Sequence, residues 1–573
     1  MKNIIEIVKN KRWIHYLIIS LIGIAVCIPL FWIQIRHTDD GWLHLIRLIG
    51  LDKSMAESNF PYLVAPYICR DFGYSMMSLY PPIVAYLPFV FSFIAGSFAG
   101  GLKVFAALSM AASGIFMYNF VHEVTKNKGI SFLAAIIYII FPYRFEVIFD
   151  RFAIGEFTAF IFIPIVLQGL YNLLKGDKKK HFYLTIGAVG LLLSHTISTL
   201  YTAIFCVILI IFNYRSFFKK EVILKCIINV IFILLISALF LIPLLEYKSQ
   251  AVYSIFMPNV MRTSGEYTKD KGIEPVQFLK DLEEDGVSFV VGIPILTMLM
   301  LGLLAYKHID KKYKTFYITF LILGAFSAFM CTKYFPWYYM PNILNTIQYP
   351  WRMLGFALFF LSPICAINII SLLKCLKQEK NRMIVLIGIL VFTGIFTGIK
   401  LSHYYVKENN IDNLYESNLK NDLKISHFSV NRDYLPYNAL IRQFGYTNER
   451  EDRIYILSGD VSVYDEQKSG LNFSCYLLEG IEGTNIELPY IFYPGYTVIL
   501  KEKDNSKILN TFESDNGFLT IQLPQDINKA YLTVEYTGTT LEKASYCISA
   551  ISLIGFIGYI IYSKKQEKKE EKE

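Results

Sequence analysis

Apolar residues run along this chain in long blocks, and short connectors rich in lysine and arginine separate the blocks. A bilayer core of about 30 Å needs roughly 20 apolar residues per helix, and many of these blocks reach that length. The first block, 16–35, is too long for a signal peptide and lacks a small-x-small cleavage site, so we expect it to remain as a span. The pattern predicts a polytopic α-helical membrane protein.

Basic connectors mark the cytoplasmic side of such a protein. Here they include "KGDKKKH" (175–181), "KCLKQEKNR" (374–382) and the terminal "SKKQEKKEEKE". The block 81–99 opens with two prolines and carries a third, and proline removes helical hydrogen bonds that lipid cannot replace. We therefore expect that block to lie in the outer face. This leaves about twelve transmembrane helices, both termini in the cytoplasm and a large first external segment, 34–101.

The stretch 401–543 has a different pattern. Runs such as "FLTIQLP" (518–524) and "AYLTVEYTG" (530–538) alternate apolar and polar residues and are bounded by turn residues. Period-two alternation is typical of β-strands with one buried face. We expect a transmembrane domain over 1–400, a small extracellular β-sandwich-like domain over 401–543, and a last transmembrane helix with a charged cytoplasmic tail over 544–573.

Composition agrees with this class. The chain has 573 residues, of which 54% are hydrophobic and only 18% charged, which excludes a disordered chain and an ordinary soluble enzyme. The net charge of +8 is what lysine-rich cytoplasmic loops produce, and it does not indicate a nucleic-acid partner.

The first cluster of polar residues follows the first span, in "RHTDDGWLHLIR" (36–47). The spacing predicts an amphipathic helix along the outer membrane face, on which Asp40, His44 and Arg47 share one stripe. A solvated stripe with an Asp at the helix start would explain the same pattern.

Three more polar groups fall at predicted external ends of spans. A short span, 130–142, is followed by "YRFEVIFDRFAIGEFTAF", which contains Arg151 and Glu156. His195 interrupts an apolar stretch at a predicted turn, and Arg352 begins a span. Each has a structural alternative. Arg151 and Glu156 would form a boundary ion pair, His195 would be a structural histidine, and Arg352 would be an interfacial anchor.

The shared location of these residues predicts a water-filled cavity that opens outward at the level of the lipid headgroups. A carboxylate can take a proton from an acceptor hydroxyl, and arginine, histidine or a divalent metal can stabilise a phosphate leaving group. Together these groups suit a substrate whose phosphate is attached to a lipid.

The chain also resembles known families. The acidic pair after the first span, the external "YPP" (80–82) and the acidic residue after a short span resemble the GT-C glycosyltransferase superfamily. More narrowly, the chain resembles bacterial "6-pyruvoyl-tetrahydropterin synthase-related" and YfhO-like membrane proteins. The motifs behind this resemblance are "DGWLHLIRL" with "NFP", "GYSMMSLYPP", "RFAIGEFTAFIFIPIV", "LLLSHTIS", "YPWRML" and "LPYIFYPGYTVIL". No histidine zinc triad indicates pterin chemistry.

The resemblance implies transfer of a sugar from a polyprenyl-phosphate donor to an acceptor outside the cell, which is an envelope polymer, a glycolipid or a protein. Asp39 or Asp40 would be the base, and Glu156 would be the second acidic residue. Many superfamily members carry Asp at that second position, so a divalent metal (Mg²⁺ or Mn²⁺) on Asp40 and Glu156 stays open. The residues expected to bind the substrate are His44, Arg47, Arg70, Arg151, His195 and Arg352.

Two other functions remain open at this point. A transporter or flippase of a lipid-linked or anionic substrate would place its site near the membrane midplane between inverted repeats, and we find no repeat. A non-catalytic scaffold for envelope assembly would use 401–543 as its binding module.

Overall fold

The computed structural model describes residues 11–33, 35, 38–57, 62–257, 263–279, 290–405, 432–441, 450–503 and 505–570. Arg36 and His37 of the first polar motif, the "NFP" at 59–61, and 406–431 and 442–449 of the predicted external domain lie outside the described residues.

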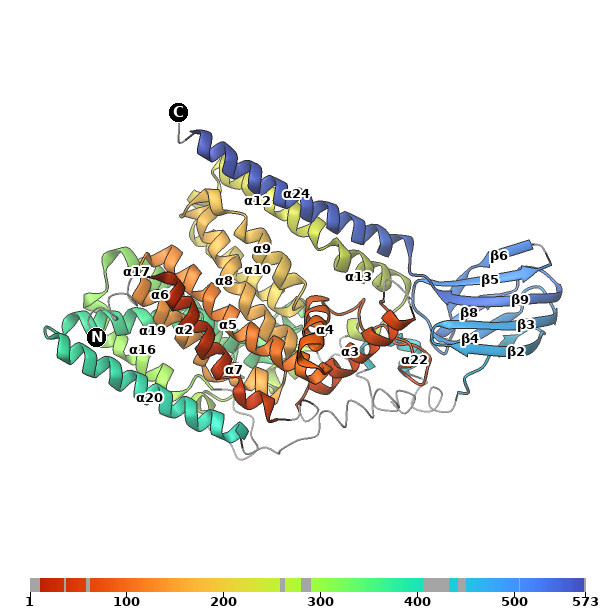
Figure 1. Ribbon diagram of the computed structural model, residues 1–573, viewed down its shortest axis with the longest axis horizontal. Helices are drawn as coiled ribbons and strands as arrows, with labels where there is room; N and C mark the ends of the chain where they lie inside the picture. Colours follow the sequence, from red (N-terminus) through yellow and green to blue (C-terminus); the bar gives the residue numbers. More distant parts are fainter. Residues whose placement is uncertain are drawn as a thin grey trace.

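The body of the molecule is helical, and a β-sheet region lies at one end of it (Figure 1). Among the described residues, six helices are long and apolar enough to cross a membrane, or eight if each of two bent helix pairs counts as one span. The predicted number of about twelve is therefore not confirmed and stays a prediction. The six long helices are α5 (Phe98–Thr125), α8 (Ile154–Leu174), α17 (Lys311–Met330), α19 (Leu354–Cys375), α20 (Glu379–Tyr405) and α24 (Thr540–Glu570).

Shorter helices fill the rest of the body. The main ones are α2 (Arg12–Ala25), α3 (Gly41–Ala56), α4 (Ile83–Ala95), α6 (Lys128–Ile140), α7 (Pro142–Phe145), α9 (Tyr183–Leu192), α10 (Thr196–Phe212), α12 (Lys220–Ile236), α13 (Ala238–Gln250), α15 (Gly265–Asp270), α16 (Ile293–Ala305) and α22 (Tyr437–Ile441). The block 81–99 that we expected not to cross the membrane forms α4, a helix of 13 residues with Pro88 inside it.

Two breaks expected from the sequence are present. Helix α6 ends at Ile140, and the next segment, Pro142–Asp150, is bent from it by 49° and finishes in a π-helical turn, Glu146–Asp150. Helices α9 and α10 meet at residues 193–195, where Ser194 and His195 lie. Because each break ends a helix early, polar residues collect at the ends of α8 and α10 that face the same region.

Helix α3 was expected to lie along the outer membrane face, with a polar stripe that was either functional or simply solvated. The helix is instead almost entirely buried, and His44 and Arg47 are 2% and 1% exposed. The reading of a solvated stripe is therefore wrong, because the first external segment and the region near 432–434 cover this face.

The C-terminal region contains nine strands in two antiparallel sheets, with orders β1-β4-β8-β7 and β2-β3-β9-β5-β6. Both predicted strand segments are present, as β8 and β9. Inward residues such as Cys475, Val498 and Leu532 are fully buried and belong to one continuous core. The strands are β1 (Tyr455–Ser458), β2 (Ser462–Ser469), β3 (Asn472–Gly480), β4 (Asn485–Ile491), β5 (Tyr496–Glu502), β6 (Asn505–Leu509), β7 (Thr511–Glu513), β8 (Phe518–Gln522) and β9 (Ile527–Tyr536).

The sheets are anchored to the helical body at several points. Helix α24 follows β9 and runs beside α13 and α12 (Figure 1). The first external segment also touches the sheets, since the backbone N–H of Ile491 donates to Phe72 O at 2.9 Å and the Phe72 ring packs edge-on against Phe518. The β-region therefore rests on the same face of the body as the first external segment.

Candidate functional site

A cavity of about 440 Å³ lies where α3, the start of α8, the start of α10 and the segment 348–352 meet. Residues far apart in the sequence contribute polar side chains to it. Of the residues expected from the sequence, those that line the cavity are Asp40, His44, Arg151, Glu156, His195 and Arg352.

The start of α3 is fixed by its backbone and by Thr38. The N–H groups of Asp39 and Asp40 donate to the carbonyls of Asp150 and Arg151, at 3.1 and 2.9 Å. The Thr38 hydroxyl accepts from the N–H of Gly41 at 3.1 Å, while Asp40 occupies the N-cap position without a side-chain capping bond. The Asp40 carboxyl is thus held at the cavity without being used to cap the helix.

Burial raises the pKa of the Asp40 carboxyl above its usual value, and the nearby Arg151 opposes that rise. A raised pKa brings a carboxylate closer to the range in which it works as a general base. Asp39 is exposed and does not line the cavity. Of the two expected bases, the geometry favours Asp40.

Glu156 is held by two donors. Its Oε2 accepts from Arg151 Nη1 at 2.9 Å, its Oε1 accepts from Tyr143 OH at 2.6 Å, and Arg352 Nε lies 3.9 Å from Oε2. The Glu156 and Arg151 side chains are only 4% and 8% exposed. Because both carboxylate oxygens of Glu156 already accept a hydrogen bond, we assign Glu156 the task of orienting the guanidinium groups of Arg151 and Arg352.

Several buried donors at or next to the cavity lack a hydrogen-bond partner among the described residues. His44 Nε2 and Arg352 Nε belong to residues that line the cavity. Arg47, whose Nε and Nη2 also make no hydrogen bond, contacts His44 from outside the lining. Buried polar groups in folded proteins are normally hydrogen-bonded, so a group of orphans needs an explanation such as an absent ligand. All of these atoms are donors, which favours an anionic ligand.

The state of His44 follows from its contacts. Its Nδ1 accepts from Arg47 Nη1 at 2.7 Å, because a guanidinium can only donate. Burial, and next the charge of Arg47, lowers the pKa of His44 well below its usual value. The ring is therefore neutral with its proton on Nε2, the nitrogen without a partner. Arg47 itself does not line the cavity; its guanidinium stacks over Tyr80, 4.1 Å from the ring centre.

His195 has a structural task as well. It is the N-cap residue of α10, and its Nδ1 accepts from the backbone N–H of Ser198 at 3.3 Å. Its ring lies against Gly155: a Cβ at residue 155 would come within 2.9 Å of His195 Cδ2 and 3.1 Å of Tyr80 OH.

The remaining expected residue, Arg70, does not line the cavity and lies in a turn of the first external segment with φ +58°. The structure also adds residues that the sequence reasoning missed: Tyr80, Gln348, Tyr349, Asp433 and Tyr434. Asp433 had no periodicity or motif to indicate it, because it precedes the strands in a stretch with neither helical nor alternating pattern.

The fit of a metal ion to Asp40 and Glu156 can be examined from the donors. Among the described residues, no three His, Cys, Asp or Glu side chains gather as a metal-binding group. Glu156 already lies between the guanidinium groups of Arg151 and Arg352, and their positive charges repel a cation at this position. The arrangement therefore does not fit a metal held by these two carboxylates, and metal dependence stays a prediction.

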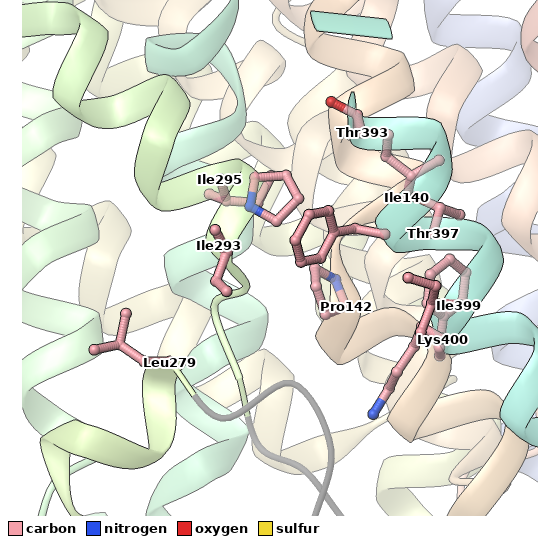
Figure 2. Close-up of a pocket in the computed structure, with 12 residues that line it drawn as sticks. Ile140, Pro142, Leu279, Ile293, Ile295, Thr393, Thr397, Ile399 and Lys400 are labelled. Atoms are coloured by element: carbon pink, nitrogen blue, oxygen red, sulfur yellow. The ribbon is translucent and has the colours of Figure 1, made fainter. Parts of the chain in front are cut away.

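A second cavity, of about 270 Å³, is apolar and separate from the first (Figure 2). It lies between the α6–α7 bend, the start of α16 and the end of α20, with Pro142, Ile293 and Thr397 on its walls. In Figure 2 the Lys400 amine points away from the apolar side chains. Among the described residues that line this cavity, Lys400 is the only one with a titratable side chain.

Comparison with known proteins gives one informative relative. A protein of Lactococcus lactis subsp. cremoris (strain MG1363), described as an uncharacterized protein, is 22% identical over 564 residues, covering 91% of this chain and 90% of its own length. No family model matches the chain. The alignment spans most of both chains.

Proposed function

We propose that this protein is a membrane glycosyltransferase that moves a sugar from a polyprenyl-phosphate donor to an acceptor outside the cell. The observation that carries the proposal is the meeting, in one cavity, of an uncommitted carboxyl, Asp40, with buried cationic and neutral donors that lack partners. A base beside an anion-binding group is what transfer from a phosphate leaving group requires. The resemblance to the GT-C superfamily supports the same reaction.

The reaction is written on this geometry as a single displacement. Asp40 takes the proton of the acceptor hydroxyl, and the acceptor oxygen forms a bond to the anomeric carbon of the sugar. The bond from that carbon to the phosphate oxygen breaks, and its electron pair leaves with the polyprenyl phosphate. Arg352 and His44 Nε2 donate to the departing phosphate. Glu156, the Ile347 carbonyl and Gln348 Oε1 hold Arg352 in position.

The proposal includes a location. The site would face the outside of the cell membrane, both termini would lie in the cytoplasm, and the partners would be membrane lipid, the lipid-linked sugar and an envelope acceptor. A requirement for Mg²⁺ or Mn²⁺ is tested in the same assay by adding each metal or a chelator.

The test is a transfer assay with the purified full chain in lipid nanodiscs. A panel of polyprenyl-phosphate sugars is incubated with envelope extract, and released polyprenyl phosphate and glycosylated product are measured. Asp40→Asn should lower the rate about 10²–10⁴-fold, the usual contribution of a general base. Asp52→Asn is the matched control, because Asp52 is on the same helix but does not line the cavity.

Undiminished transfer in folded Asp40→Asn protein would refute the proposed base. Uptake of a donor into proteoliposomes without any glycosyl product would instead identify a transporter. A binding measurement tests the phosphate-binding group separately from the base. Polyprenyl phosphate should raise the melting temperature of the native protein, and it should raise that of Arg352→Gln less.

A further inference from the structure

Residues 432–441, here called the strap, lie in the sequence between the helical body and the β-region, and two of them line the cavity. The strap begins with a 3₁₀ turn, Arg432–Tyr434, and continues into α22. It is the part of the chain that brings Asp433 and Tyr434 to the cavity.

The strap is fixed from three directions. The backbone N–H of Tyr434 donates to Tyr74 OH at 3.3 Å, and its carbonyl accepts from Tyr493 OH at 3.0 Å. The carbonyl of Leu435 accepts from the N–H of Ser254 at 2.9 Å. The first external segment, the loop after α13 and the β-region therefore all hold it, so the position of Asp433 is determined by tertiary contacts.

The Asp433 side chain has no structural task among the described residues, where it forms no hydrogen bond and no ion pair. It is partly buried and lines the same cavity as Asp40. The titratable groups around it are Asp40, Tyr74 and Tyr434. A partly buried carboxyl with no cation beside it costs stability, and such costs are found where a residue serves a ligand.

We propose that Asp433 is a further residue of the site, coupled by like charge to Asp40, so that the two carboxyls act as one pair that receives the acceptor's proton. This inference rests on the proposed function. One member of the pair comes from the start of the helical body and the other from the strap, so the site is complete only when the β-region is docked. Burial, with the charge of Asp40 added, raises the pKa of Asp433 to about 6.

The first test needs no substrate. Melting temperatures are measured for the native protein, Asp40→Asn, Asp433→Asn and the double variant, at pH 8 and pH 5. At pH 8 each single change should raise the melting temperature, because each removes the same repulsion, and the double variant should gain less than the sum. Gains that add up at pH 8 would overturn the pair.

The pH dependence has a definite sign. The folded-state pKa of Asp433 lies above the unfolded value of 3.8, so its cost to stability appears as pH rises from about 4 through about 6. The advantage of Asp433→Asn should therefore be full at pH 8 and smaller at pH 5. Asp515→Asn, at an exposed position in the β-region, is the control and should change nothing at either pH.

The second test uses the donor that the transfer assay identifies, with water as acceptor. In the native protein the rate falls when the first carboxyl of the pair is protonated. Asp433→Asn removes one carboxyl and the repulsion between the two, so the acid limb of the rate profile should move to lower pH. A purely structural role would lower the rate at every pH and leave that limb in place, which would contradict the proposal. If no donor reacts but the melting temperatures show coupling, the proposed function fails while the carboxyl pair stands.

Discussion

At the scale of single residues, two sets of buried charges can be compared within this one chain. In the β-region, the Arg450–Glu487 pair is completely buried, and both carboxylate oxygens of Glu487 accept hydrogen bonds. Arg450 Nε donates to Oε1 at 3.1 Å, and Ser514 and Asn516 donate to Oε2 at 2.7 and 3.0 Å. At the cavity, by contrast, Nε of the buried Arg352 has no hydrogen-bond partner among the described residues, and neither has Nε2 of the neutral His44. Satisfied charges hold a fold together, while unsatisfied ones mark the place of a ligand.

The satisfied pair gives a prediction about stability. Arg450→Met leaves the Glu487 charge buried without its cation, which should cost about 3–5 kcal/mol and lower the melting temperature of the full chain. The matched control is Arg453→Met, because Arg453 pairs with Glu451 at 2.8 Å but both side chains are more than half exposed. That change should cost at most about 1 kcal/mol. Equal losses in the two variants would contradict this account of the buried pair.

At the scale of elements, the site is built from helices that stop early. The bend after Ile140, the break between α9 and α10, and the start of α8 each leave polar residues at the rim of one cavity. The elements can meet only because Gly155 has no side chain, which allows His195 and Tyr80 to approach the first turn of α8. The site therefore requires the start of α8 and the start of α10 to lie close together.

Gly155→Ala should therefore disturb the site. The added methyl group meets His195, Ser194 O and Tyr80, so we expect a loss of about 1–3 kcal/mol in stability and a smaller melting-temperature rise on adding polyprenyl phosphate. Gly388→Ala on α20 is the control, because nothing lies within 4 Å of the added carbon. If Gly155→Ala behaves like the control, the tight packing at the start of α8 is not important for the site.

At the scale of the whole molecule, the cavity joins parts that are far apart in the sequence: the start of α3, the middle of the helical body and the strap before the β-region. The β-region is held to this body by α24, by the first external segment and by the strap (Figure 1). In the topology that we propose, α24 crosses the membrane, so that the cavity and the sheets lie on one side and the end of α24 lies on the other.

That sidedness can be measured with a membrane-impermeant maleimide. In a background with the exposed Cys375 and Cys547 changed to Ser, Ile508→Cys on β6 should react in intact cells, because residue 508 is 70% exposed. Lys564→Cys, near the end of α24, should react only after the cells are permeabilised. The opposite labelling pattern would place the cavity on the cytoplasmic side and exclude an external acceptor.

The sequence alone indicated the class of the molecule and six of the residues that line the polar cavity. Long apolar blocks, proline positions and period-two runs predicted the helical body, the breaks near residues 142 and 195, and the C-terminal strands, because these patterns are local consequences of burying one face in lipid or in a sheet. The same local reasoning identified Asp40, Glu156 and Arg352.

Tertiary structure decided what local patterns do not contain. Covering by other segments turned the α3 stripe inward, and the turn around Arg70 carried that residue away from the cavity. Long-range contacts also brought Asp433 beside Asp40, although almost four hundred positions separate them. Which side chains share a cavity depends on how distant segments pack, and burial in that cavity then shifts their pKa values. The hydrophobic period of a single helix or strand predicts neither the set of cavity residues nor their protonation.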